Sequence, residues 1–164
     1  MLKTLYMMVG IPGSGKSWFA QNNLVSSWDY RWAYISRDQI RFGILGDKED
    51  YFAHEDEVYK AFVKAIAWNL NDLSTTEVIA DATHLNWKSR RKLLDALAQS
   101  VDMSKVDVIP VVVTASLETC LKRNAMRTGR EFVPKSVIRR MSYQLTDPKN
   151  DPYKYTAIMR VVNE

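Results

Sequence analysis

Eight residues near the amino terminus have the types and spacing of a phosphate-binding loop. Residues 10–17 read Gly-Ile-Pro-Gly-Ser-Gly-Lys-Ser and fit the pattern G-x-x-x-x-G-K-[ST]. Glycines in such a loop let backbone N–H groups approach phosphate oxygens, and the helix that follows adds partial positive charge. The apolar stretch 5–9 predicts a strand before the loop, and the stretch from Lys16 onward predicts a helix after it, which is the context that the pattern requires.

The pattern assigns nucleotide binding to the loop. Lys16 is expected to reach the β- and γ-phosphates of ATP and to take part in catalysis, and the Ser17 hydroxyl is expected to ligate Mg²⁺. ATP and Mg²⁺ are therefore the predicted cofactors. The predicted ATP-binding residues of the loop are Gly10, Gly13, Ser14, Gly15, Lys16 and Ser17.

A carboxylate and a guanidinium follow the second predicted strand. Asp38 and Arg41 are three residues apart, so they share a face on a helix. A kinase that acts on a hydroxyl needs a carboxylate beside the acceptor oxygen, and a cation helps to hold an anionic acceptor. We therefore predict that Asp38 is catalytic and that Arg41 binds the acceptor. The alternative is an ordinary helix start, with Asp38 favoured by the helix dipole and Arg41 solvated.

Cations gather again in the last third of the chain. Arg123 and Arg127 are four residues apart and repel each other on a helix face unless an anion lies near both. We predict that residues 123–134 form a helical lid, in which both arginines bind ATP and Arg127 also neutralises the transferring phosphoryl group. A solvated basic helix end is the alternative.

The segment after the third predicted strand carries weaker signals. Asp81 is a candidate to hold Mg²⁺ through water. Thr83, His84 and Asn86 are candidates for binding the acceptor. His84 is also a candidate base, although a single histidine more often packs or forms a local hydrogen bond.

Two further patterns have a structural and a nucleic-acid interpretation. An aromatic stripe alternates along the second predicted strand and could stack bases, but packing beneath a helix is favoured. A basic run on a later helix could touch a phosphate backbone, but a solvated helix face is favoured. The stripe consists of Trp28, Tyr30, Trp32 and Tyr34, and the run consists of Lys88, Arg90, Arg91 and Lys92.

The elements that must position these residues alternate between strand and helix. This alternation predicts an α/β fold of the P-loop NTPase type, with a mostly parallel sheet of about five strands and helices on both faces. Pro110 suggests that the fourth strand is an edge strand or bends. Ligands bind outside the carboxyl ends of parallel strands, where the loop and the segments 36–41 and 81–86 would meet. Strands are expected at 5–9, 32–35, 77–80, 106–113 and 156–162, and helices at 16–26, 37–45, 51–73, 87–99, 116–128 and 134–145.

The composition limits the class of protein. A chain of 164 residues with 46% hydrophobic and 26% charged residues suits one globular domain, 1–164. Its net charge of +4 is compatible with a polyanionic partner. The single cysteine, Cys120, cannot form an internal disulfide, which favours a reducing compartment and a buried thiol. We find no apolar run long enough to cross a membrane and no secretion signal, so we expect a cytoplasmic protein without a membrane partner.

Four blocks, in this order, resemble the P-loop kinase domain of the phage polynucleotide 5′-kinase family. The resemblance spans nearly the whole chain. It implies that Asp38 is the general base, that Arg41 binds an acceptor phosphate, that Arg123 and Arg127 belong to the lid, and that a phage-encoded protein would work in the host cytoplasm. The blocks are the loop at 10–17, Ser36-Arg-Asp-Gln-Ile-Arg41, Val78-Ile-Ala-Asp-Ala-Thr-His-Leu-Asn86, and Arg123-Asn-Ala-Met-Arg127 with Val133-Pro134.

The chain departs from the family pattern at two points. Bifunctional members carry a phosphatase domain with an Asp-x-Asp-x-Thr motif, which does not occur in this sequence, so phosphate removal is not expected. The stretch Asp81-Ala-Thr-His84 has one residue more than the family pattern, which leaves the choice of acceptor open.

Residues and resemblance together predict an ATP- and Mg²⁺-dependent kinase that transfers the γ-phosphate to a hydroxyl on nucleic acid. The 5′-hydroxyl end of DNA or RNA is the leading acceptor. One alternative is a phage DNA-modification kinase that phosphorylates 5-hydroxymethyluracil or another 5-hydroxymethylpyrimidine in DNA. A second is a small-molecule kinase that acts on a nucleoside, sugar or antibiotic. A third is a nucleotide-binding regulatory module without phosphoryl transfer, against which Asp38 argues.

Overall fold

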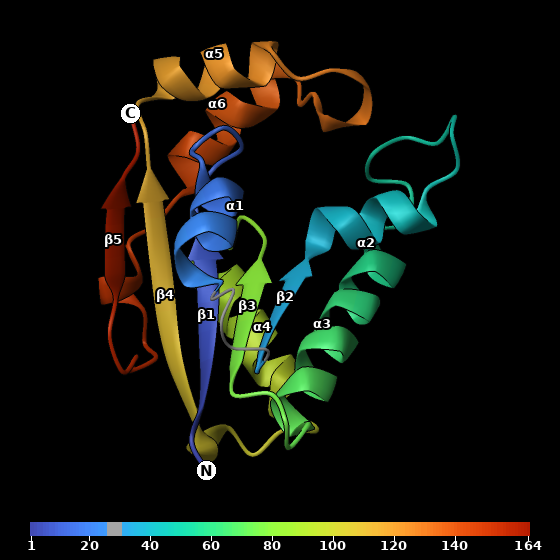
Figure 1. Cartoon of the computed structure of the whole chain (residues 1–164). Helices are drawn as coiled ribbons and strands as arrows, with labels where there is room; N and C mark the ends of the chain where they lie inside the picture. Colours follow the sequence, from blue (N-terminus) through green and yellow to red (C-terminus); the bar gives the residue numbers. More distant parts are fainter. Residues whose placement is uncertain (26–30) are drawn as a thin grey trace.

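The central element is a five-stranded sheet in which every neighbouring pair of strands is parallel, in the order β2-β3-β1-β4-β5 (Figure 1). The structure is a computed structural model that describes residues 1–25 and 31–164. It confirms the predicted α/β fold and parallel sheet. The strands are β1 (Lys3–Val9), β2 (Trp32–Ser36), β3 (Glu77–Asp81), β4 (Val106–Thr114) and β5 (Met159–Val162).

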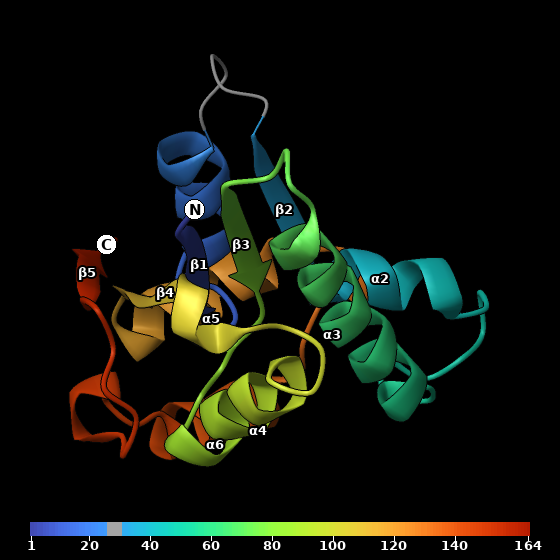
Figure 2. The same ribbon diagram turned by 90° about the horizontal axis from the view of Figure 1, so that it is seen from below.

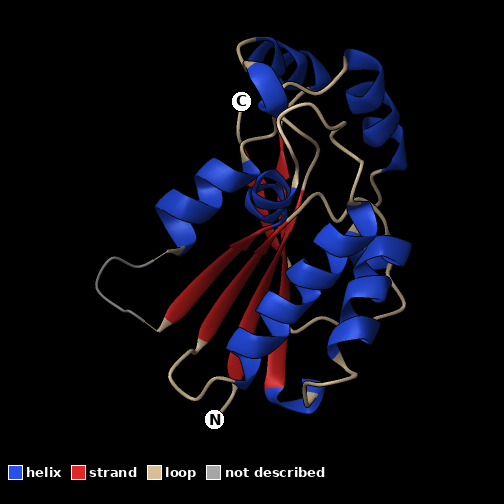
Figure 3. Cartoon of the chain, turned by 90° about the vertical axis from the view of Figure 1, so that its right-hand side faces the viewer, coloured by secondary structure: helices blue, strands red, loops and turns tan. Residues whose placement is uncertain are grey.

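Helices cover both faces of the sheet (Figures 2 and 3). The longer helices are α2 (Arg37–Ile44), α3 (Glu55–Asn71), α4 (Trp87–Leu97), α5 (Leu117–Ala125) and α6 (Lys135–Gln144). The shorter ones are α1 (Lys16–Phe19), η1 (Ala20–Leu24), η2 (Met103–Lys105), η3 (Gly129–Glu131) and η4 (Pro148–Asn150).

Apolar side chains on the two faces of the central strands form two cores. On one face, Leu5 and Met7 of β1 pack with the apolar sides of α3 and α4. On the other, Met8 of β1 packs with Ala20 of η1 and with side chains of β3 and β4. Fully burying one such side chain contributes about 1.5–3 kcal/mol. Two cores therefore fix β1, and with it the start of the loop at residue 10.

Several helix boundaries differ from the prediction, and the largest difference lies beside the cavity described below. The predicted helix 51–73 begins at Glu55, where three consecutive acids occupy the first turn and suit the helix dipole. Tyr51 and Phe52 belong to the turn before it. The predicted helix 16–26 is α1 followed by the π-helical turn η1, which ends at Leu24, and Ser26 lies outside the described residues.

The prediction that Pro110 marks an edge strand was wrong. Strand β4 is interior, between β1 and β5. However, the pairing with β5 begins only at Val111, opposite Met159, so β4 has one neighbouring strand at Pro110. The missing N–H of proline is tolerated at such a position.

The predicted lid, residues 123–134, comprises the end of α5, η3 and the residues up to the start of α6, and α5 and α6 pack through Cys120 and Ile138 against Ile11. Cys120 is buried, as expected. Asn124, which is fully buried, donates from Nδ2 to the Val133 carbonyl at 2.7 Å and accepts from the Val133 N–H at 3.0 Å. These two bonds hold together the ends of the segment between α5 and α6. The part of the chain that the structure describes contains no helix long and apolar enough to cross a membrane.

One residue of the basic run does not belong to a solvated face. Arg90 is fully buried and forms a bidentate pair with Asp151, at 2.6 Å from Nε and 2.7 Å from Nη2. Its Nη1 donates to the His84 carbonyl at 2.9 Å. Arg90 therefore joins α4, the loop after β3 and the segment before β5. Arg91, in contrast, is exposed.

We predict that Arg90→Ala lowers the free energy of unfolding by about 3–5 kcal/mol, because it leaves Asp151 buried without its partner. Arg91→Ala is the matched control and should change it by less than about 0.5 kcal/mol. Urea denaturation followed by circular dichroism measures both. Equal effects of the two substitutions would show that the buried pair does not stabilise the fold.

Candidate active site

The ends of three strands surround a cavity of about 240 Å³. The parallel order β2-β3-β1 brings the carboxyl ends of these strands to one edge of the sheet. The segments that follow them, together with the lid region, contribute the walls. Residues from all four predicted blocks therefore share one cavity. They include Lys16, Ser17, Asp38, Asp81, Thr83 and Arg127.

The phosphate loop leaves β1 through glycines that no other residue can replace without a clash or strain. Gly13 and Gly15 have φ of 86° and 88°, in the left-handed region that favours glycine. A Cβ on Gly10 would lie 2.7 Å from the Val113 carbonyl oxygen, and one on Gly13 would lie 2.5 Å from that of Cys120. The loop is therefore a narrow cradle of backbone, as phosphate binding requires.

One polar atom of the loop lacks a partner within the protein. The Ser14 hydroxyl is buried and has no hydrogen-bond partner among the described residues. A buried hydroxyl without a partner is costly. The residues present therefore fit a bound phosphate chain, which would meet backbone N–H groups and the Lys16 ammonium.

Two hard oxygen donors, Ser17 and Asp81, lie at the same cavity. Asp81 ends β3 and accepts a hydrogen bond from the Tyr34 hydroxyl. Burial, followed by the charge of Asp81, raises the pKa of Tyr34 to about 12, so this hydroxyl stays protonated and keeps donating. Oxygen donors suit Mg²⁺, which keeps several waters and is bound largely through substrate phosphates. Among the described residues there is no cluster of three His, Cys, Asp or Glu side chains arranged for a metal.

Tyr34 packs against the core that contains Ala20 of η1, as the favoured interpretation of the aromatic stripe predicted, and it also has a second role. Its hydroxyl supports Asp81 from the neighbouring strand β2. Sequence reasoning missed this contact, because the β2–β3 pairing that creates it is not visible in local spacing. Trp28 and Tyr30 of the stripe lie outside the described residues.

Asp38 presents its carboxylate to the cavity from the first turn of α2. Ser36 begins the helix by accepting a hydrogen bond from the Gln39 N–H. The Asp38 side chain is 57% exposed. Its Oδ1 accepts hydrogen bonds from the Tyr51 hydroxyl and from Arg41 Nη1. One carboxylate oxygen is thus engaged by the protein. The other, Oδ2, has no hydrogen bond among the described residues.

Arg41 lies behind Asp38 rather than open to an acceptor phosphate. Its side chain is 5% exposed. Nε and Nη2 donate to Glu55 Oε1 at 2.9 and 2.6 Å, and Nη1 donates to the Tyr51 hydroxyl at 2.7 Å as well as to Asp38. Burial, and next the charge of Asp38, raises the pKa of Tyr51. The predicted clamp for an acceptor phosphate is therefore occupied by protein groups, chiefly Glu55, which sequence reasoning missed.

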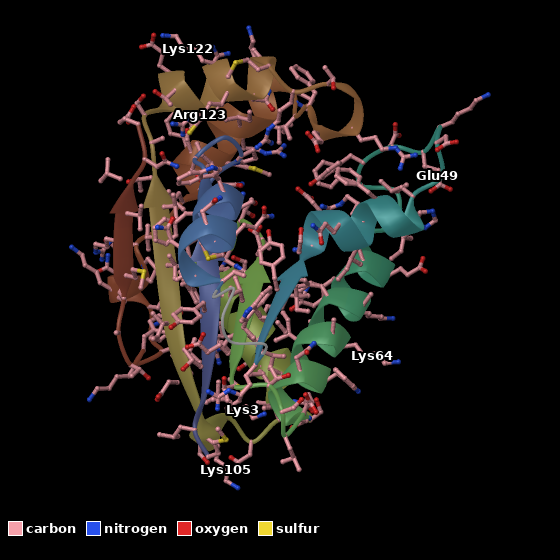
Figure 4. The ribbon with its side chains drawn as sticks, viewed as in Figure 1. Lys3, Glu49, Lys64, Lys105, Lys122 and Arg123 are labelled. Carbon is pink, nitrogen blue, oxygen red and sulfur yellow. The ribbon has the colours of Figure 1, made fainter. Side chains whose placement is uncertain are left out.

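The two lid arginines occupy different places. Arg127 lines the cavity, and Arg123 does not. Arg123 points from α5 toward the phosphate loop (Figure 4), where its Nη1 donates to the carbonyls of Gly13 at 3.2 Å and of Asn163 at 2.9 Å. It therefore ties the loop to the end of β5 in the structure, instead of reaching into the cavity as expected for a residue that binds ATP directly.

Of the three residues predicted to bind the acceptor after β3, only Thr83 lines the cavity. His84 is buried beneath the loop, with Nδ1 2.6 Å from the Met8 carbonyl oxygen and φ of 42°. Burial lowers its pKa to about 4, so the imidazole is neutral at pH 7. Asn86 caps α4 by accepting from the Ser89 N–H at 3.0 Å. The structure therefore does not bring His84 and Asn86 into the lining of the cavity.

We predict that His84 makes stability depend on pH. The imidazole titrates near pH 6.5 in the unfolded chain and near 4 in the fold, so between these values only the unfolded chain binds the proton. Stability therefore falls as the pH falls. Between pH 7 and 5 this group should remove about 2 kcal/mol. Asparagine tolerates positive φ, so His84→Asn should fold without this dependence.

Urea titrations of both proteins at pH 7 and pH 5 measure the difference. Each protein serves as its own reference at pH 7, so a constant loss of stability from the substitution does not matter. The same loss of stability on acidification in both proteins would contradict a buried neutral His84.

The fold and the cavity define a P-loop kinase-like domain, and such a fold implies the use of a nucleotide, ATP. The chain belongs to the AAA domain family, whose model matches residues 5–148.

Three solved structures place the fold among known proteins. A chain in the Pnkp1/Rnl/Hen1 RNA repair complex is 25% identical, with a TM-score of 0.68 over 88% of this chain and 44% of that one. A fungal RNA kinase is 15% identical, with a TM-score of 0.67 over 100% and 76% of the two chains. A sugar kinase from Janibacter sp. HTCC2649 is 18% identical, with a TM-score of 0.54 over 99% and 85%. The chain spans less than half of the first of these proteins, and the other two likenesses show the fold alone.

Proposed function

We propose that the protein is an ATP-dependent kinase that transfers the γ-phosphate to a hydroxyl on nucleic acid, with the 5′-hydroxyl end of DNA or RNA as the leading acceptor. One observation carries the proposal. The half-exposed carboxylate of Asp38 lines the same cavity as Lys16 and Ser17. A carboxylate in that position is what an alcohol acceptor needs and what a site for nucleotide binding alone does not need.

Each residue of the cavity has its own role in the phosphoryl transfer. Lys16 and the loop N–H groups hold the phosphates of ATP, and Ser17 and Asp81 would hold Mg²⁺, which would neutralise phosphate charge. The acceptor oxygen forms a bond to the γ-phosphorus while the bond from that phosphorus to the β,γ-bridging oxygen breaks. The hydroxyl proton passes to Asp38, and ADP leaves with the electron pair. Arg127 stabilises the negative charge on the phosphoryl group during transfer.

Tyr51 and Arg41 orient the proton acceptor. Both donate to Oδ1 of Asp38, so Oδ2 is the oxygen available for the hydroxyl proton. A fixed carboxylate loses less side-chain entropy when the acceptor binds, which favours a productive geometry. In this proposal Arg41 supports catalysis through Asp38.

The name of one similar structure supports nucleic acid as the acceptor. The chain that is 25% identical belongs to an RNA repair complex. Because a sugar kinase is among the similar structures, the experiment below also includes small-molecule acceptors. At 18% identity, the sugar kinase supports the fold and not the substrate.

A second acceptor, a 5-hydroxymethylpyrimidine in DNA, is favoured by two observations. Arg41 is occupied by Glu55, so the cavity lacks the free clamp that a phosphate beside a 5′-hydroxyl would use. Phe52 is 51% exposed and lines the cavity beside Tyr51. The two rings are in an edge-to-face arrangement, with their centres 4.7 Å apart. Exposed aromatic rings suit a flipped base.

The position of transferred label separates these acceptors. The protein is incubated with γ-labelled ATP and, in separate reactions, 5′-hydroxyl DNA, 5′-hydroxyl RNA, duplex DNA containing 5-hydroxymethyluracil, nucleosides and sugars. We expect the label at the 5′ end of an oligonucleotide, and we expect phosphatase to release it from the undigested oligonucleotide. Label found on internal nucleotides after digestion would show that the acceptor is the modified base and not the 5′ end. Label found only in nucleosides or sugars would contradict a nucleic-acid acceptor.

A further inference from the structure

A groove of about 460 Å³ runs between α3 and the end of α4, outside the cavity described above. Apolar side chains such as Val63 and Ala67 form its floor. The aromatic rings of Tyr59 and Trp68 and the side chains of Lys60 and Lys64 form its walls. Lysines are present and acidic residues are absent from the lining. The groove is therefore suited to a partner that combines planar apolar groups with negative charge.

The cations of the groove are available for a partner. Lys60, Lys64 and Trp68 are each one turn apart and lie on one face of α3. Neither lysine forms an ion pair with any described residue, and Lys64 projects from α3 into solvent (Figure 4). Trp68 is 68% exposed.

Lys92 adds a third cation from α4. Its Nζ lies 4.3 Å from the centre of the Tyr59 ring. The acids at the start of α3, Asp56 and Glu57, do not line the groove. Positive charge from two helices therefore borders the same aromatic surface.

The groove begins one helical turn from the cavity along α3. The first residue of this helix, Glu55, lines the cavity, and Tyr59, one turn later, lines the groove. Arg37, another cavity residue, has its guanidinium carbon 5.3 Å from the centre of the Tyr59 ring. From the cavity, α3 (green) runs alongside β2 toward the far end of the sheet (Figure 1). At 1.5 Å per residue, Trp68 is about 20 Å from Glu55 along the helix.

We propose that this groove binds the single-stranded part of the acceptor nucleic acid beyond the nucleotide that receives the phosphate. The inference rests on the proposed function. Lys60, Lys64 and Lys92 neutralise backbone phosphates, and bases stack on Trp68. A nucleic-acid strand matches the groove better than a protein helix, because a helix would cover the apolar floor and leave the basic walls without opposite charge. At about 3.4 Å per nucleotide step, the distance of about 20 Å takes about six steps, so a strand needs roughly seven nucleotides to reach Trp68 from the cavity.

Acceptors of two lengths distinguish binding in the groove from binding in the cavity, because only the longer one can reach along the groove to Trp68. Thymidine oligonucleotides of 3 and 12 residues with 5′-hydroxyl ends are compared on the wild type, on the double variant Lys60→Glu/Lys64→Glu, and on Trp68→Ala. Lys105→Glu, at an exposed lysine that ends η2, is the control. The readouts are the KM of each oligonucleotide, the KM of ATP, and direct binding of a fluorescent 12-mer by anisotropy from 50 to 200 mM salt.

We expect the double variant to raise the KM and the Kd of the 12-mer at least tenfold, with the KM of the 3-mer and of ATP within twofold of the wild type. The slope of log Kd against log salt should fall by about 1.4, since each phosphate contact on a single strand contributes about 0.7. Trp68→Ala should weaken 12-mer binding at least about fivefold. The control should match the wild type. If the charge reversal impairs folding, Lys60→Gln/Lys64→Gln repeats the test with neutral side chains.

Two results would contradict strand binding in the groove. The first is a Kd for the 12-mer that stays at the wild-type value in both variants. The second is a KM that rises equally for the 3-mer and the 12-mer. In either case the proposed function stands as long as the 12-mer is phosphorylated. Absence of transfer to any oligonucleotide would instead contradict the proposed function. The anisotropy measurements would still decide whether the groove binds a strand.

Discussion

The placement of one carboxylate governs what the cavity can do. Asp38 is exposed, and an exposed side chain ordinarily samples several rotamers. Here Tyr51 and Arg41 both hold the same oxygen. Behind Asp38, Arg41 has Glu55 as a second acidic partner, and a buried guanidinium that loses a partner destabilises a fold by several kcal/mol. The position of Arg41 therefore depends on Glu55, which forms its own hydrogen bonds with Arg37 and Arg41.

The sheet order explains how distant segments reach this carboxylate. Strand β3 lies between β2 and β1, so the end of β2, which leads into Asp38, lies two strands away from the phosphate loop. The register sets Ser36 opposite Asp81. The width of one strand thus separates the acceptor side from the nucleotide side, with the proposed metal ligand Asp81 between them. Another strand order would have separated the same residues.

Local sequence patterns predicted the parts of the structure that local physics decides. The five strands, the phosphate loop and the placement of Asp38, Lys16 and Arg127 near one edge followed from apolar stretches, glycine spacing and the rule for parallel sheets. The contacts of Arg41, Arg90 and Arg123 did not follow. Their partners, among them Glu55, Asp151 and Asn163, are 14, 61 and 40 residues away in the chain. Spacing shows which face of a helix a charge occupies, but not which group lies across from it.

The most direct test of the account compares Asp38→Asn with the wild type and with Asp95→Asn, an exposed control on α4. Asparagine keeps the shape of Asp38 but cannot take the hydroxyl proton. We predict that transfer to the 5′-hydroxyl acceptor falls by at least about 10²-fold, that the Kd of ATP stays within twofold, and that the control behaves as the wild type. Transfer by Asp38→Asn at close to the wild-type rate would remove the carboxylate from the mechanism and contradict the account.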